Sequence, residues 1–94
     1  MTGKERAALR RMANTIQPIF QIGKGGVGEA MLEQLGMALD ARELIKITVL
    51  ETADVTAREA CDILCQVLGA EPVQCIGRKV TIYRRNEKEP KIQL

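Results

Sequence analysis

The sequence contains no histidine and no tryptophan, and its only aromatic residues are Phe20 and Tyr83. Without histidine, the chain lacks the commonest general base and metal ligand. With so few aromatic rings, the core must be aliphatic, and binding by stacking bases on aromatic side chains is nearly excluded. We therefore expect no catalytic chemistry, no cofactor and no metal site.

Long hydrophobic runs are also missing. No apolar stretch approaches the roughly 20 residues that a helix needs to cross a bilayer, and the first residues are charged rather than signal-like. The cysteines, Cys61, Cys65 and Cys75, are odd in number, which suits a reducing compartment better than a disulfide framework. We expect a soluble, cytoplasmic protein with no membrane partner, in which the cysteines are small buried residues.

The net charge of +2 is unevenly distributed along the chain. Residues 1–28 hold five bases against one acid, residues 29–71 hold three against nine, and residues 72–94 hold six against two. This pattern suggests that the two basic ends converge into one positive surface, although ordinary solvated charge remains the alternative. We expect one domain over residues 1–85, followed by a charged, flexible tail over residues 86–94.

Periodicity and turn residues predict the element order αβαβαββ. Two Thr-x-x-Glu capping boxes, Thr2 to Glu5 and Thr56 to Glu59, open the first and third helices. Lys46 should lie on the sheet face opposite the core. The first predicted helix begins near residue 2, and the other two cover about 29–39 and 56–68. The predicted strands cover about 19–22, 44–50, 73–76 and 80–83. Tyr83 should lie on the same face as Lys46.

The segment Ile22–Gly28 places four glycines and Lys24 between a predicted strand and a predicted helix. Glycine permits positive φ angles and close approach of another molecule, and the first amides of a helix carry the positive end of its dipole. The loop is therefore suited to an anion. As G-x-x-G, from Gly23 to Gly26, it is typical of contact with nucleic-acid backbones. As G-x-G-x-x-G, it is the dinucleotide pattern.

The dinucleotide interpretation has one further support, because Glu51 follows the second predicted strand, near where a ribose-binding acid belongs. Three features count against it. The usual sheet has about six strands, whereas this chain supplies four and joins the last two as a hairpin. Gln17, Pro18 and Gln21 interrupt what should be an apolar first strand. No substrate site follows. A P-loop is a separate alternative, and it fails because no Lys-Ser or Lys-Thr pair ends the loop.

The nucleic-acid interpretation uses the loop amides and Lys24 against phosphates. Contacts of this kind give affinity without reading bases, so recognition would depend on the shape of a structured RNA. Two other interpretations stay open: the glycines only form a tight turn, or the acidic second and third helices dock on a protein. The further basic residues that could join the loop are Arg10 and Arg11 in the first helix and Arg78, Lys79, Arg84 and Arg85 around the final hairpin.

Three segments together resemble a known family. Gln21–Val27, Ala38–Ile47 and Val73–Arg84 are similar in residues, order and spacing to the CRM domain, and most closely to the free-standing bacterial YhbY-type proteins. The resemblance covers about residues 2–85. One departure is Gly28, which stands where a Ser or Thr helix cap would be more natural.

The resemblance implies a fold, a partner and a site. The fold would be a four-stranded mixed sheet with flanking helices, similar to the C-terminal domain of bacterial translation initiation factor three. Family members bind RNA through the G-x-x-G loop and the adjacent basic surface, and the bacterial single-domain forms associate with precursors of the large ribosomal subunit. We therefore expect a ribosome assembly factor that binds precursor large-subunit rRNA in a pre-ribosomal particle, not DNA; the alternative is a module docking on a ribosomal protein. The predicted RNA-binding residues are Gly23, Lys24, Gly25, Gly26, Arg10, Arg11, Arg78, Lys79, Arg84 and Arg85.

Overall fold

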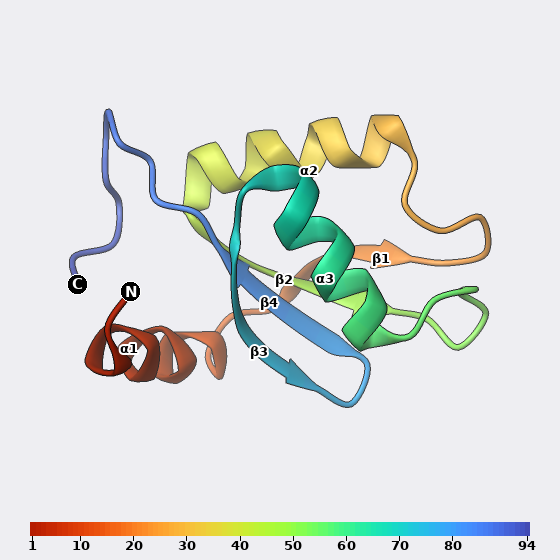
Figure 1. Ribbon diagram of the computed structural model, residues 1–94, viewed down its shortest axis with the longest axis horizontal. Helices are drawn as coiled ribbons and strands as arrows, with labels where there is room; N and C mark the ends of the chain where they lie inside the picture. Colours follow the sequence, from red (N-terminus) through yellow and green to blue (C-terminus); the bar gives the residue numbers. More distant parts are fainter.

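The computed structural model describes all 94 residues and confirms the predicted αβαβαββ order (Figure 1). None of its helices combines the length and the apolar character that crossing a membrane requires. The elements are α1 (Gly3–Ala13), β1 (Pro18–Ile22), α2 (Glu29–Arg42), β2 (Leu44–Val49), α3 (Ala57–Leu68), β3 (Glu71–Ile76) and β4 (Lys79–Tyr83).

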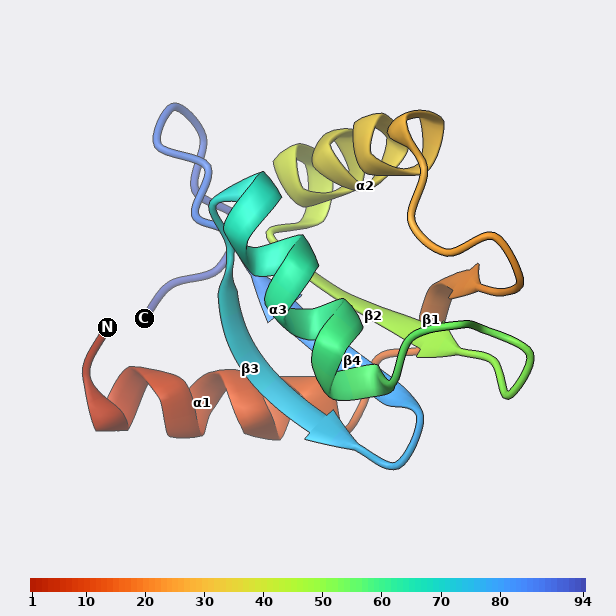
Figure 2. The ribbon, with the colours of Figure 1, turned by 45° about the vertical axis from the view of Figure 1, so that its right-hand side comes forward.

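The four strands form one mixed sheet in the order β1-β2-β4-β3. β1 and β2 are parallel, which requires a crossover connection, and α2 supplies it. β4 is antiparallel to both β2 and β3. As a result, the loop after β1, the loop after β2 and the β3–β4 turn all lie at one end of the sheet, which we call the loop end (Figures 1 and 2).

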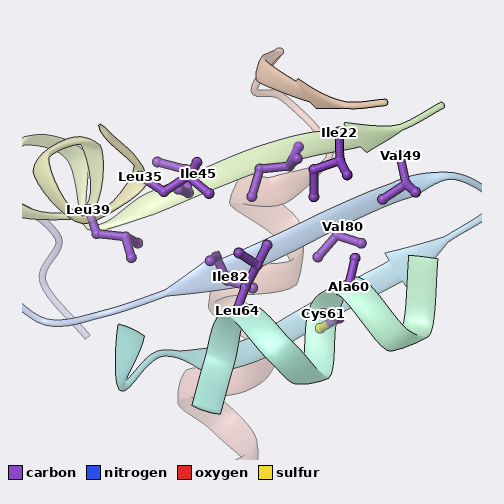
Figure 3. Close-up of a cluster of buried hydrophobic side chains, with 11 residues drawn as sticks. Ile22, Leu35, Leu39, Ile45, Val49, Ala60, Cys61, Leu64, Val80 and Ile82 are labelled. Atoms are coloured by element: carbon purple, nitrogen blue, oxygen red, sulfur yellow. The ribbon is translucent and has the colours of Figure 1, made fainter. Parts of the chain in front are cut away.

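The main core lies between the sheet and the helices α2 and α3 (Figure 3). Ile45, Ile47 and Val49 alternate along β2 and point into this core, as the sequence pattern predicts. Leu35 and Leu39 reach it from α2. The aliphatic composition of this cluster fits the scarcity of aromatic residues in the chain.

The opposite face of the sheet carries a second, smaller core that the sequence does not reveal. Leu9 and Ala13 of α1 pack there against Leu44, Val73 and Tyr83. The side chains of Leu44 and Tyr83 belong to this face because their neighbours along β2 and β4 face the main core. The face that was predicted to lie opposite the core is thus covered by α1 over part of its area, and Tyr83 is only 5% exposed.

The three helices begin differently. The predicted capping boxes of α1 and α3 are both present, and each Thr hydroxyl accepts a hydrogen bond from the backbone amide of the Glu three residues later, at 3.1 Å. In contrast, α2 begins after Gly28, and no side chain caps it. Its first amides are therefore left without the partners that the other two helices supply for themselves.

The other end of the sheet is closed by Glu43, a fully buried residue between α2 and β2. Its carboxylate accepts hydrogen bonds from the backbone amides of Asn86 at 2.7 Å and of Lys91 and Ile92 at 2.6 Å each. Ile92 packs against the second core. These contacts fold residues 86–94 back on the domain, while the predicted flexibility of this tail stays a prediction. We call this region the tail end.

Candidate nucleic-acid interface

The glycine loop begins with a tight turn directly after β1. The amide of Gly26 donates to the carbonyl oxygen of Gly23 at 3.0 Å, which makes Lys24 and Gly25 the two central residues of a β-turn. Gly25 has a φ of +102° and Gly26 a φ of +70°, and a Cβ added at either position would meet nothing within 4 Å. These two glycines are therefore required by backbone conformation rather than by crowding.

The turn leaves several backbone donors without a partner in the protein. The amides of Lys24, Gly25, Val27 and Gly28 donate no hydrogen bond within the chain, and the start of α2 is uncapped. Lys24 is exposed and forms no ion pair. Unpaired amides, the positive end of a helix dipole and a mobile cation thus meet in one short segment, which is the arrangement that binds a phosphate.

The β3–β4 turn brings two more bases to the loop end. Its position is fixed through the backbone, because the amide of Val49 donates to the carbonyl oxygen of Arg78 at 2.7 Å. β4 lies two strand spacings from β1, or about 10 Å, so the glycine loop and the β3–β4 turn follow strands that are close to each other in the sheet. The structure places three predicted residues, Lys24, Arg78 and Lys79, at the same end of the sheet. However, Lys79 alternates with Val80 of the main core and therefore lies on the sheet face opposite α2.

Arg78 has a protein partner that the sequence did not suggest. Its guanidinium lies 3.1 Å from the carboxylate of Glu51, a residue considered from the sequence only as a ribose ligand. Both side chains are more than half exposed, so this ion pair contributes little to stability and can exchange for another partner. The signal that finds it is the register of β2 on β4, which places Thr48 beside Lys79 and so brings the two loops that follow together.

Arg84 lies at the tail end, at the opposite end of β4 from Arg78, and its side chain is hydrogen-bonded within the protein. Its guanidinium donates to the carbonyl oxygens of Leu68 at 2.8 Å and Gly36 at 2.9 Å, and to the carboxylate of Asp40 at 2.9 Å. Together these three contacts join α2 to the end of α3. Arg84 therefore lies apart from the basic residues at the loop end, and three of its N–H donors are used inside the protein, while contact of Arg84 with RNA stays a prediction.

Arg85 also lies at the tail end, where it is exposed and 3.9 Å from the carboxylate of Glu87. The five residues of β4 hold it about 17 Å from the β3–β4 turn. Arg10 and Arg11 are exposed on α1, which covers the sheet face opposite α2. The predicted single positive surface is thus divided, and only Lys24, Arg78 and Lys79 share the loop end.

The cysteines form no metal site. Cys61 and Cys65 lie one turn apart on α3, and a hydrogen bond between them lowers the pKa of the Cys61 thiol and raises that of Cys65. Cys61 is only 1% exposed. No group of three or more Cys, Asp or Glu side chains is arranged to hold a metal ion.

Comparison with known proteins agrees with this fold. Residues 1–84 match the CRS1 / YhbY (CRM) domain. The chain is 37% identical over 94 residues to a Bacillus subtilis protein named "Probable RNA-binding protein YqeI", covering all of this chain and 98% of the relative. It is 31% identical to a Haemophilus influenzae protein named "RNA-binding protein", covering all of this chain and 94% of the relative.

A solved structure shows the same architecture. The solution structure of a Staphylococcus aureus protein, 41% identical in sequence, superposes with a TM-score of 0.80, and the match covers all of this chain and 98% of that one. The mixed α/β fold with its four-stranded sheet is therefore shared by both chains. Because the domain match extends over nearly the whole sequence, this chain belongs to the CRS1 / YhbY (CRM) domain family.

Proposed function

We propose that this protein binds structured RNA through the loop end and acts on precursor rRNA of the large ribosomal subunit as an assembly factor. One observation carries the proposal. The glycine loop leaves its amides and the start of α2 unpaired beside the free cation Lys24, at the end of the sheet that also holds Arg78 and Lys79. The names of the relatives, which describe RNA-binding proteins, support RNA as the ligand.

The mechanism follows from what each group can donate. The loop amides and the first amides of α2 hold one phosphate, and Lys24 neutralises part of its charge. Lys79 adds a cation for a second phosphate, and Arg78, whose ion pair with the exposed Glu51 is weak, stays available for another group of the RNA. Such contacts fix how an RNA backbone lies on the protein, and the spacing between the two phosphates selects the shape of the RNA.

The loop is tested by a charge reversal that leaves the fold intact. Lys24→Glu should weaken binding to all structured RNAs and lower the slope of log affinity against log salt by about one, because one phosphate contact is lost. Lys4→Glu is the matched control, since it reverses an exposed charge on α1, on the opposite sheet face. Equal salt slopes for the two variants would show that Lys24 does not contact phosphate.

The assembly role is tested by sedimentation of the protein in a low-salt gradient of cell extract. We expect comigration with precursors of the large subunit, abolished by RNase and by Lys24→Glu. Comigration that survives RNase would favour docking on a ribosomal protein through α2 and α3. Protein that stays at the top of the gradient would contradict the ribosomal role.

A further inference from the structure

A surface cavity that is open to solvent lies at the loop end, between the loop after β2 and the β3–β4 turn. It has a volume of about 580 Å³, which is within the usual range for small-ligand pockets. Leu50 joins it to the glycine loop, because a Cβ added to Gly23 would lie 3.5 Å from the Leu50 side chain. Its lining consists of Leu50, Glu51, Ala53, Asp54, Val55, Thr56, Ala57, Gly77 and Arg78.

The lining combines apolar surface with groups of both hydrogen-bonding types. Leu50, Ala53 and Val55 are partly buried and supply apolar surface. The exposed carboxylate of Asp54 forms no hydrogen bond and no ion pair within the protein, so its oxygens are free to accept. Arg78 uses one nitrogen for Glu51 and keeps further N–H donors free.

These charges disfavour a phosphate in the cavity. Glu51 and Asp54 outnumber Arg78, so the cavity repels anions although it adjoins a phosphate-binding loop. Among the parts of an RNA that can donate to a carboxylate, the ribose 2′-hydroxyl offers a single O–H, whereas a base can offer N–H donors together with acceptors on one flat ring. A flat, largely apolar base with donors along one edge therefore fits this lining better than backbone does.

Guanine matches the lining best among the four bases. Its N1–H and N2–H groups are two adjacent donors, which a carboxylate such as that of Asp54 accepts together. Its O6 and N7 atoms are the acceptors that an arginine such as Arg78 binds in a bidentate manner. Adenine, cytosine and uracil have neither a pair of adjacent N–H donors nor the pair of acceptors formed by O6 and N7.

We propose that this cavity holds an unpaired guanine next to the phosphate bound by the glycine loop. The proposal rests on the proposed function and refines it: the loop binds the backbone of a structured RNA, and the cavity selects a bulged or looped guanine within it. Asp54 accepts from the N1–H and N2–H edge, and Arg78 donates to O6 and N7. The site thus gives base specificity to a surface that otherwise reads only shape.

The test uses RNA hairpins that are identical except for one bulged nucleotide, measured at a single salt concentration. The hairpin with a bulged guanine should bind about tenfold tighter than those with adenine, cytosine or uracil, as expected for one bidentate base contact. Inosine lacks the N2 amine and 7-deazaguanine lacks N7, so each should lose part of this preference. Equal affinity for all four bulges, or a preference for another base, would overturn the assignment.

The protein side is tested by Asp54→Asn, with Asp62→Asn as the matched control. Both remove one exposed negative charge, but Asp62 lies on α3 outside the cavity. Asp54→Asn should abolish the guanine preference while affinity for the other hairpins stays the same or rises, and Asp62→Asn should keep the preference. A guanine preference that persists in Asp54→Asn would overturn the role of this carboxylate.

The two proposals can fail separately. Binding without base preference that is still weakened by Lys24→Glu leaves the RNA-binding function intact and removes only the guanine site. Failure of every hairpin to bind would contradict the proposed function itself, and with it the guanine site.

Discussion

Arg78 and Arg84 flank the same short strand, one residue before β4 begins and one residue after it ends. Arg84 is partly buried and donates to three acceptors in α2 and α3. Arg78 is exposed and has only the exposed carboxylate of Glu51 as a partner. A positive charge at a strand end is therefore no guide to binding until the partners of its N–H donors are known.

The backbones at the two ends of the sheet differ in the same way. Glu43 at the tail end has a φ of +66°, which a side chain rarely adopts, and the hydrogen bonds to its carboxylate hold it there. Gly25 at the loop end has a φ of +102° with no neighbour to hold it, so the conformation relies on glycine itself. The carboxylate at the tail end is hydrogen-bonded within the protein, whereas backbone donors at the loop end have no partner there.

The largest expected effect comes from breaking the tail end. Glu43→Gln should lower the free energy of unfolding by about 3 kcal/mol. The side-chain NH2 group that replaces one carboxylate oxygen would direct its N–H donors toward the backbone N–H donors of the tail. For a domain of this size, the melting temperature should fall by about 10–20 °C. Urea unfolding measures the loss, and Glu33→Gln on the exposed side of α2 should stay within about 0.5 kcal/mol of the wild type.

The same variant should also change the response to acid. Burial alone raises the pKa of Glu43, but the amides of Asn86, Ile92 and Lys91 outweigh burial and lower it below its ordinary value of 4.5. The stabilisation is therefore complete above about pH 4.5 and is lost as the pH falls through the lowered pKa. Because Gln cannot titrate, the difference in the free energy of unfolding between the wild type and Glu43→Gln should narrow in this acid range. A constant difference would mean that the tail does not hold the Glu43 carboxylate.

The second prediction separates the two arginines. Arg84→Ala should lower the free energy of unfolding by about 2 kcal/mol, because it leaves the carbonyl oxygens of Leu68 and Gly36 without their donor, and folded protein should bind RNA as before. Arg78→Ala should change stability by less than about 0.5 kcal/mol and weaken RNA binding. Unfolding curves measure the stability of the two variants, and filter binding at one salt concentration measures their affinity for RNA. An Arg84 variant that folds well but loses RNA would reverse the comparison.

Local patterns in the sequence predicted the elements well, for physical reasons that can be named. The capping boxes at Thr2 and Thr56 fix where two helices begin, because each is a complete set of local hydrogen bonds. The alternation of apolar and polar residues along β2 predicted which face of this strand meets the main core. The resemblance to the CRM domain supplied a four-stranded mixed sheet with flanking helices, and the order of the strands came only from the structure.

Contacts between distant segments could not be predicted in this way. The ion pair of Arg78 with Glu51 and the bonds of Arg84 to α2 and α3 depend on strand order, which composition does not encode. The same holds for the hydrogen bonds between Glu43 and the tail, which span more than 40 positions of the chain. Charge counting therefore grouped Arg84 with Arg78, although β4 separates them.

The smallest expected effect is a change of one hydroxyl at the loop end. Gly28 has a φ of −94° and a ψ of 171°, close to the conformation of the capping residues Thr2 and Thr56, and a Cβ there would meet nothing within 4 Å. Gly28→Ser should therefore cap α2 and raise stability by a few tenths of a kcal/mol, about the difference between these two caps. The hydroxyl would occupy an amide that we assign to the phosphate, so RNA affinity should fall about threefold to tenfold.

Gly28→Ala is the control for this change, because it adds a Cβ without a hydroxyl and leaves the amides of α2 open. We expect Gly28→Ala to bind RNA like the wild type while losing a little stability, so the two variants should move in opposite directions in each measurement. Thermal melts and RNA titrations on the same samples test both. Tighter or unchanged RNA binding by Gly28→Ser would mean that the uncapped start of α2 is a structural defect rather than a binding site, and the contrast between the two ends of the sheet would then rest on Lys24 and Arg78 alone.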